Sequence, residues 1–321
     1  MLLLPLSGCY VPAQRSETFF FMDTVIGVTL YTRDNERAEA AFDSCHTLLG
    51  ELEALWSRHT ETSEISKFNA SEQGIDAPDP RTVALLQAAI EVAQGTNGAF
   101  DPTVTPLITL WDTAGERDRL PTDAELAQAL SRVDYAGLEI TSDRIGKTDP
   151  NLALDLGGIG KGAAISALLD LLKASGVEGG LVTFGSNVAV FGKKPNGEPF
   201  RVALRDPKNA NATVGILPLG EGQILSVSGD YERYVTVGGE RYHHILDPQS
   251  GYPAKSGLSS VAVISSDGAL ADALSTALLV MGSEKALELH RSGAFSFEAI
   301  LISSSGAITL TDGLRDRFEA A

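Results

Sequence analysis

Residues 152–165 read LALDLGGIGKGAAI, and this stretch decides how the rest of the chain is interpreted. Its apolar residues alternate up to Leu154 and predict a buried strand that ends at Asp155. Glycines then lead into an Ala/Leu-rich segment that predicts a helix to about Ser175. Because the first N–H groups of a helix are unpaired, this glycine turn could hold a phosphate, with Lys161 as a compact positive charge. A tight turn followed by a surface lysine would produce the same pattern.

Two common nucleotide-binding motifs do not match this stretch. A P-loop needs four residues between its first glycine and its Gly-Lys-Ser/Thr, whereas Gly157 lies too close to Gly160, and Gly162 replaces the hydroxyl residue. A dinucleotide-binding turn belongs to the first strand–helix unit of a parallel sheet and is followed by an acidic residue about twenty positions later. Neither description fits the chain.

The charge balance narrows the class of ligand. The 321 residues are 43% hydrophobic and carry a formal net charge of −17 at pH 7. With no cluster of Lys and Arg, this balance argues against nucleic acid as a partner. An acidic protein that binds a polyphosphate needs local neutralisation, and a divalent cation is the usual means. No apolar run of about eighteen residues predicts a membrane-spanning helix.

The first residues resemble a lipoprotein signal. Leu6-Ser7-Gly8-Cys9 is similar to the lipobox of bacterial lipoproteins, in which the cysteine becomes lipidated. Residues 1–20 would then be a signal remnant and a polar tether, followed by one domain at 21–321. An incidental apolar start is the alternative. Cys45, inside a predicted helix, is expected to be a lone buried thiol.

The remaining segments predict an α+β fold, a single large domain of mixed, largely antiparallel sheets flanked by helices. Helical periodicity covers residues 34–56, 80–95 and 122–130. Closely spaced strand patterns from residue 179 onward are separated by hairpin signals, which predicts antiparallel pairing. The stretch GAFDPTVTPLITLWD, residues 98–112, contains two prolines and is expected to be a loop rich in functional groups.

Two groups of polar residues could carry chemistry. Asp272 and Thr276 are four positions apart in a predicted helix, with Ser275 adjacent, and hard oxygen ligands at this spacing suit magnesium. The structural alternative is an aspartate near a helix start and a threonine bonded back to a carbonyl. His243 and His244 face opposite sides of a predicted strand, so at most one can serve as a general base in a given site.

Seven segments, in this order, resemble the ApbE-type FAD:protein FMN transferases, which are magnesium-dependent flavin transferases of bacterial cell envelopes. The segments lie between Phe21 and Gly282 and read FMDTVIG, SRHTETSEISKFN, GAFDPTVTPLITLW, LALDLGGIGKGAA, SVSGDYERY, HHILDPQSGYP and ADALSTALLVMG. The resemblance implies that FAD is cleaved at its pyrophosphate, that FMN passes to a threonine hydroxyl of an acceptor protein, and that AMP leaves. It also implies a location in the cell envelope, facing the periplasm or the outside. With the lipobox-like segment, the membrane contact would be a lipid on Cys9.

The resemblance also implies roles for single residues. His244 would be the base, because the family motif has histidine directly before Ile-Ile/Leu-Asp-Pro. Magnesium would be held by Gly158 through its carbonyl, Asp272 and Thr276, with Ser275 beside them. FAD would be contacted at Met22, His59, Phe100, Asp101, Pro102, Asp155, Lys161 and Leu246.

The chain departs from the family pattern at two positions. Asp23 stands where the family usually has glycine, and His59 stands where it usually has tyrosine. A histidine can still stack on a flavin or adenine ring, but it is smaller and titratable. Two other functions stay open from the sequence: an envelope FAD pyrophosphatase, in which water replaces the threonine, and an FAD-binding lipoprotein without turnover.

Overall fold

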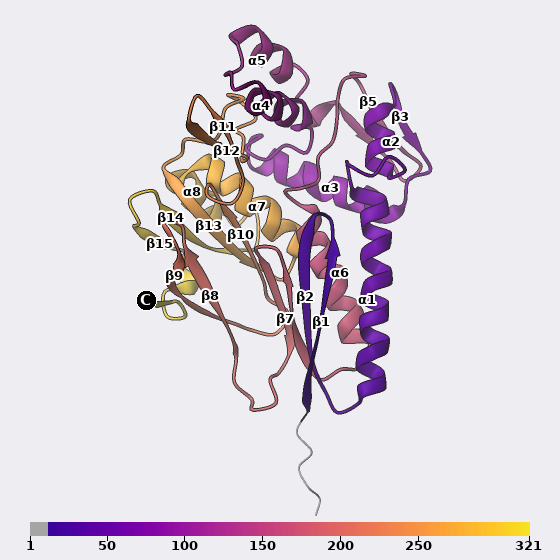
Figure 1. Cartoon of the computed structure of the whole chain (residues 1–321), viewed down its shortest axis with the longest axis vertical. Coiled ribbons are helices and arrows are strands. Elements are labelled where there is room, and N and C mark those ends of the chain that lie inside the picture. Colours follow the sequence, from indigo (N-terminus) through magenta and orange to yellow (C-terminus); the bar gives the residue numbers. More distant parts are fainter. Residues whose placement is uncertain (1–11) are drawn as a thin grey trace, which may run out of the picture.

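The computed structural model describes residues 12–321, so that Cys9 and the lipobox-like segment lie outside the described residues. Its centre is an eight-stranded sheet in which every neighbouring pair is antiparallel (Figure 1). In sheet order the strands are β1 (Ala13–Phe21), β2 (Thr24–Thr32), β6 (Gly179–Phe184), β7 (Asn187–Gly192), β10 (Ile224–Gly229), β13 (Leu258–Ser265), β14 (Glu298–Ser303) and β15 (Ile308–Leu310). The predicted antiparallel pairing is therefore confirmed.

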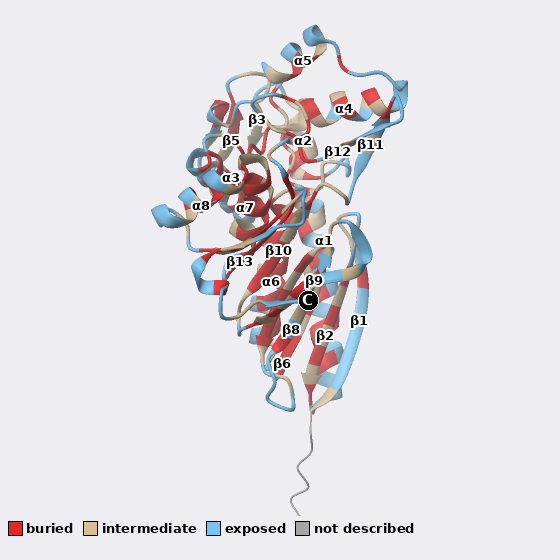
Figure 2. Cartoon of the chain, turned by 90° about the vertical axis from the view of Figure 1, so that its left-hand side faces the viewer, coloured by how far each residue is buried: buried red, intermediate tan, exposed pale blue. Residues whose placement is uncertain are grey.

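Both faces of this sheet are covered, which explains why the central strand β13 is buried along its whole length. In β13 every residue is buried: Val261 and Val263 join the core under the helices, whereas Ala262 and Ile264 join a second core on the opposite face. Figure 2 shows the contrast between these buried central strands and the largely exposed edge strand β1. The helical face is covered by α1 (Asn35–Trp56), α6 (Gly160–Ala174) and α7 (Gly268–Met281).

A small sheet covers the opposite face. It contains β16 (Glu319–Ala320), β9 (Asn209–Leu219) and β8 (Phe200–Asp206), in that order. Phe200, Leu204 and Leu217 of these strands pack against the main sheet. The molecule is thus an α+β structure of three layers, as the sequence predicts.

The other elements gather at one end of the main sheet, above the ends of β2 and β10 in Figure 1. Helices there are α2 (Glu64–Ala70), α3 (Pro80–Gly95), α4 (Thr105–Arg117), α5 (Asp123–Leu130) and α8 (Ser283–Ser292), with the 3₁₀ turn η1 (Tyr135–Gly137). Two short sheets consist of β3 (Gly74–Asp76), β5 (Arg144–Lys147) and β4 (Leu138–Ile140), and of β11 (Tyr234–Val237) and β12 (Glu240–His243). A second 3₁₀ turn, η2 (Asp312–Leu314), follows β15.

Several local predictions are confirmed by the helix ends. The side chain of Asp34 caps α1 by accepting from the N–H of Arg37 over 3.1 Å, and α3 begins at Pro80.

Cys45 is buried in α1 as a free thiol. None of the described helices is both long and apolar enough to cross a membrane.

The loop predicted at residues 98–112 is wrong in its second half, because α4 begins at Thr105. Pro106 lies in the first turn of this helix, where a missing N–H removes no helical hydrogen bond. Its apolar residues, including Leu107 and Trp111, pack against β11. The two prolines therefore mark the entry into a helix rather than a continuous loop.

Part of the predicted N-terminal tether is a strand of the main sheet. The sequence predicts a signal remnant and tether over residues 1–20, but β1 begins at Ala13 and pairs with β2 along its whole length, from Ala13 opposite Thr32 to Phe21 opposite Thr24. Phe19 explains the strand, because it is buried against the helical layer, with its ring in edge contact with that of His46 in α1. The sheet thus includes residues that composition alone assigns to a linker.

The strand predicted before Asp155 does not form. The backbone at Leu154 pairs instead with one side chain: Asn69 Nδ2 donates to the Leu154 carbonyl over 2.9 Å, and Asn69 Oδ1 accepts from the Leu154 N–H over 2.7 Å. Lys147 Nζ donates to the Leu152 carbonyl over 2.9 Å. Side chains thus satisfy a buried backbone that the apolar alternation predicts as a strand.

Candidate active site

A cavity of about 900 Å³ lies where the end of the main sheet meets the upper elements. Eleven of the residues proposed from the sequence line it: Met22, His59, Phe100, Asp101, Asp155, Gly158, Lys161, His244, Leu246, Asp272 and Thr276. The fold therefore brings together residues that are up to 254 positions apart (276 − 22). Two predicted residues, Pro102 and Ser275, do not line the cavity.

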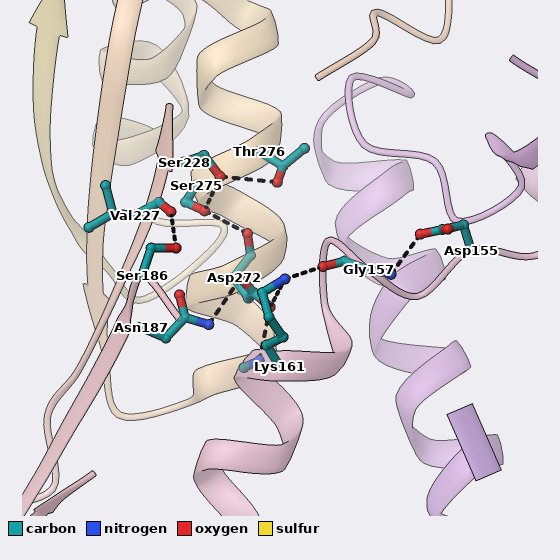
Figure 3. A network of polar contacts seen from close by, with 11 residues as sticks. Asp155, Gly157, Lys161, Ser186, Asn187, Val227, Ser228, Asp272, Ser275 and Thr276 are labelled. Carbon is teal, nitrogen blue, oxygen red and sulfur yellow. Dashed lines mark hydrogen bonds and ion pairs between the residues drawn. The ribbon is translucent and has the colours of Figure 1, made fainter. Parts of the chain in front are cut away.

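The carboxylate of Asp272 is held on both sides (Figure 3). Oδ2 accepts from the backbone N–H of Gly162 over 2.9 Å, and Oδ1 accepts from Asn187 Nδ2 over 3.2 Å. The Lys161 ammonium lies 4.0 Å from Oδ2, beyond hydrogen-bond distance. Asp272 is 4% exposed, so this buried carboxylate joins α6, α7 and β7 beside the cavity.

Thr276 lies one turn further along α7 and is next to Gly158. A Cβ atom added to Gly158 would lie 3.5 Å from Thr276 Oγ1 and 3.2 Å from Phe100 Cε2, so the glycine turn passes close to both side chains. Ser275 is fully buried behind them: its hydroxyl donates to the Asp272 carbonyl over 2.8 Å and lies 2.7 Å from Ser228 Oγ.

The glycine turn itself is fixed by charged side chains at both ends. Asp155 Oδ1 accepts from the N–H of Gly157 over 2.7 Å, and Asp155 Oδ2 lies 2.5 Å from Arg58 Nε. Lys161 Nζ donates to the Gly157 carbonyl. Side chains of the chain itself therefore fix the turn, and two of them, Arg58 and Lys161, are basic.

The hairpin turn between β1 and β2 explains one departure from the family pattern. Phe21 pairs with Thr24, so Met22 and Asp23 form a two-residue turn, and their φ angles of 51° and 54° are both left-handed. Glycine, asparagine and aspartate are the residues best suited to such a turn. Asp23 thus keeps the geometry, and the Met22 N–H donates to Glu53 Oε1 over 2.6 Å.

His244 follows β12 directly and faces the cavity. Its Nδ1 lies 3.1 Å from the carbonyl of Arg233, and since a carbonyl can only accept, Nδ1 carries the proton in this bond and Nε2 is the free nitrogen. The side chain is exposed to solvent in the open cavity, but protein atoms of the cavity walls crowd around the ring. This crowding removes part of its hydration and lowers the pKa of His244 to about 4. His243 is bonded differently, through Nε2 to the carbonyl of Ala254 at 3.0 Å.

The segment 100–102 borders the cavity and contacts the glycine turn. Asp101 Oδ1 accepts from both the N–H and the hydroxyl of Thr103, over 2.8 and 2.6 Å, and burial raises the pKa of this carboxyl. The Pro102 carbonyl accepts from the N–H of Asp155 over 2.8 Å. Pro102 therefore positions the glycine turn through its backbone, although its side chain does not line the cavity.

Comparison with known proteins agrees with this geometry. A family model described as the ApbE family matches residues 22–301. The chain belongs to the ApbE family.

The similarity to individual relatives and solved structures of this family covers nearly the whole of this chain. A FAD:protein FMN transferase of Vibrio cholerae is 30% identical over 315 residues, which cover 95% of this chain and 92% of the relative. One of Rhodobacter capsulatus is 33% identical over 313 residues, which cover 95% of this chain but only 58% of the relative. The apo crystal structure of the flavinyl transferase ApbE of Pseudomonas stutzeri superposes with a TM-score of 0.85 at 32% identity, covering 98% of this chain and 99% of that one. The α+β fold and membership of a transferase family are thus confirmed.

Two residues of the candidate site were missed by sequence reasoning. Arg58 lines the cavity and pairs with Asp155, and its adjacency to His59 in a family-like segment was an available signal. Asn187 contacts Asp272 from a strand, and its neighbours in sequence carry no pattern that predicts this contact. Both residues act through contacts between segments that lie far apart in the sequence.

Proposed function

We propose that this ApbE-family chain is a magnesium-dependent FAD:protein FMN transferase. It would cleave FAD at the pyrophosphate, attach FMN by a phosphoester to a threonine hydroxyl of an acceptor protein, and release AMP. The observation that supports this most is the meeting of Gly158, Asp272 and Thr276 in the same cavity as His244. Relatives with the printed function FAD:protein FMN transferase support it independently.

The donor atoms at this position fit a magnesium ion. Asp272 offers a buried carboxylate, Thr276 a hydroxyl and Gly158 a backbone carbonyl, and magnesium prefers a small number of such oxygen ligands. In the described residues no group of three or more His, Cys, Asp or Glu side chains could hold a metal, and the proposed set needs only one of these, Asp272. When bound, the ion would neutralise the diphosphate and the charge that develops during phosphoryl transfer.

The counter-charge that Asp272 has in the described residues, Lys161, lies at the limit of ion-pair distance. Gly162 and Asn187 are neutral donors, and Lys161 stays at 4.0 Å. A buried carboxylate whose counter-charge is this far away is only partly compensated, and a bound cation would complete the compensation. Ser275 fits the ion less well than Thr276, because its hydroxyl donates to the Asp272 carbonyl away from the cavity.

His244 is the proposed general base. With Nδ1 protonated and bonded to Arg233, the free Nε2 can accept a proton, and a pKa of about 4 keeps the ring neutral at pH 7. The acceptor's threonine Oγ would attack the FMN-side phosphorus while its proton passes to Nε2. The bond from this phosphorus to the bridging oxygen breaks, and that oxygen leaves on the phosphate of AMP.

A labelling reaction tests the proposal. The protein would be incubated with FAD, MgCl₂ and an acceptor domain carrying the threonine, and we expect flavin fluorescence on the acceptor band of a denaturing gel. The same acceptor with this threonine changed to alanine is the control and should stay dark. Free FMN and AMP with a dark acceptor would instead support an FAD pyrophosphatase. Unconsumed FAD would support an FAD-binding lipoprotein.

We also propose a location in the bacterial cell envelope, with a lipid on Cys9 as the membrane contact. The lipobox-like segment Leu6-Ser7-Gly8-Cys9 motivates this proposal, and it lies outside the described residues. Metabolic labelling with a radioactive fatty acid should mark the full chain in bacterial cells. Label that persists after Cys9→Ser would contradict it.

A further inference from the structure

Asn187 is an unusual buried residue because only one hydrogen bond of its side chain is recorded, and that bond goes to the site. Its Nδ2 donates to Asp272 Oδ1 over 3.2 Å, whereas its Oδ1 is buried without a partner among the described residues. The residue is 0% exposed. Buried polar atoms are nearly always paired, so an amide with an unpaired oxygen needs an explanation. The bond from Nδ2 to Asp272 offers one, because it requires this orientation of the amide.

The orientation of this amide is fixed by the carboxylate. Exchanging its oxygen and nitrogen would place Oδ1 against Asp272 Oδ1, where two acceptors repel. The neighbouring strand does not supply a recorded partner either. Ser226 of β10 lies one residue beyond the paired positions Leu225 and Val188, and its hydroxyl is likewise buried and unpaired among the described residues.

We propose that Asn187 is a positioning residue that holds the Asp272 carboxylate in the orientation needed for metal binding. This inference rests on the proposed function. Gly162 fixes Oδ2 from α6 and Asn187 fixes Oδ1 from β7, so the carboxylate plane is set from two elements. Without Asn187, one carboxylate oxygen loses its donor and the terminal torsion, which is intrinsically broad, is free to rotate. Outer partners of this kind typically contribute a factor of about 10–100 to metal affinity.

The test is a metal titration of Asn187→Leu, which keeps the approximate volume but removes the donor. Binding of Mn²⁺ to the full chain would be followed by electron paramagnetic resonance, and we expect the dissociation constant to rise about tenfold or more. FAD binding without metal, followed by flavin fluorescence, should be unchanged. Asn187→Ser, whose side chain is too short to reach Asp272, is the second variant in case the leucine variant does not fold.

Ser226→Ala is the matched control. It removes a fully buried polar group on the adjacent strand that has no recorded bond to Asp272, and it should leave the Mn²⁺ affinity unchanged. Unchanged Mn²⁺ affinity in a folded Asn187 variant would overturn the inference, and so would an equal loss in Ser226→Ala. A parent protein that binds no Mn²⁺ would overturn the proposed metal site together with this inference. A parent that binds Mn²⁺ as tightly as the Asn187 variant does would overturn this inference alone.

Discussion

The backbone N–H of Gly162 donates to Asp272 Oδ2 over 2.9 Å, and this bond joins α6 to α7 beside the cavity. The contact needs a glycine, because a Cβ atom at Gly162 would lie 1.9 Å from the Gly268 carbonyl oxygen and 2.5 Å from Asp272 Cβ. Gly268 has the reciprocal restriction, with a Cβ only 2.1 Å from the Gly162 carbonyl oxygen. The two helices therefore meet through bare backbone at the position that orients Asp272.

Gly162→Ala should accordingly be strongly destabilising. Overpacking typically costs about 1–3 kcal/mol, and we expect a loss near about 3 kcal/mol because the clash is with backbone. Urea unfolding measures it. Gly160→Ala is the control: its Cβ would be 3.4 Å from the flexible end of Met22, and stability should stay within about 1 kcal/mol of the parent. Equal stability of the two variants would show that α6 and α7 can separate without cost.

Asp272→Ala should abolish magnesium-dependent transfer. Loss of the only carboxylate in the proposed ligand set should lower the rate by about a hundredfold or more, in the range seen when a charge-stabilising group is removed from an active site. The rate of acceptor labelling, measured against magnesium concentration, checks this. Asp267→Ala is the control, since Asp267 caps the same helix by accepting from the N–H of Leu270 over 3.1 Å. It should lose some stability but keep the normal magnesium dependence. Full activity of Asp272→Ala would refute the metal assignment.

His244→Ala should separate binding from transfer. Removal of a general base typically lowers a rate by about 10²–10⁴-fold, whereas FAD affinity should change little. Flavin fluorescence gives the affinity, and acceptor labelling gives the rate. His243→Ala is the matched control, because His243 bonds to the carbonyl of Ala254, and it should keep transfer. An equal loss of FAD binding and transfer in His244→Ala would make His244 a structural residue.

The pH dependence follows from the same histidine. Desolvation by the cavity walls lowers its pKa from 6.5 to about 4, so the ring is neutral, and competent as a base, at every pH well above 4. We therefore expect kcat/KM for transfer to show no loss on acidification through about pH 6.5 and to fall only as the pH approaches about 4, since this parameter reports the free enzyme. The measurement is a pH profile of acceptor labelling, with separate checks that the acceptor stays folded. A drop centred near pH 6.5 would contradict the lowered pKa of His244.

The elements were more predictable from the sequence than their connections. Amphipathic periodicity predicted α1 and α3 closely, because their buried faces repeat every three to four residues and their first turns carry capping residues. The antiparallel sheet was predictable from hairpin signals. At Leu154 the same kind of reasoning failed, because a period-2 apolar pattern indicates burial of an extended chain but does not say what pairs with its backbone. The partner is Asn69, 85 residues earlier.

Site residues divide in the same way. Three of the predicted residues that line the cavity could be selected from the sequence. Helical spacing and the family resemblance both select Asp272 and Thr276, and the resemblance selects Gly158. Arg58 and Asn187 act through contacts between distant segments, and neither has a spacing that singles it out. Polar residues whose partners are long-range cannot be assigned from local pattern, since the same residue type is most often a cap or a surface group.

Arg58 provides the last prediction, because it is the missed residue with the clearest charge contact. Its Nε lies 2.5 Å from Asp155 Oδ2, with the two side chains 25% and 14% exposed. Arg58→Ala removes this partner and should leave Asp155 as an unpaired carboxylate on the cavity wall. The lost contact is substantial, because a hydrogen bond to a charged group contributes about 1.5–3 kcal/mol. That negative charge would repel the diphosphate, and we expect the FAD dissociation constant to rise about tenfold, which corresponds to about 1.4 kcal/mol.

A double-mutant cycle distinguishes this charge effect from a general loss of packing. In an Asp155→Asn background the unpaired charge is absent, so Arg58→Ala should raise the FAD dissociation constant much less than in the parent. Arg81→Ala is the control, because Arg81 forms an exposed ion pair with Glu51 at 2.8 Å, outside the cavity lining, and should leave FAD affinity unchanged. Identical effects of Arg58→Ala in both backgrounds would mean that Arg58 contacts the ligand or the fold independently of Asp155. An unchanged affinity in the parent background would remove Arg58 from the site altogether.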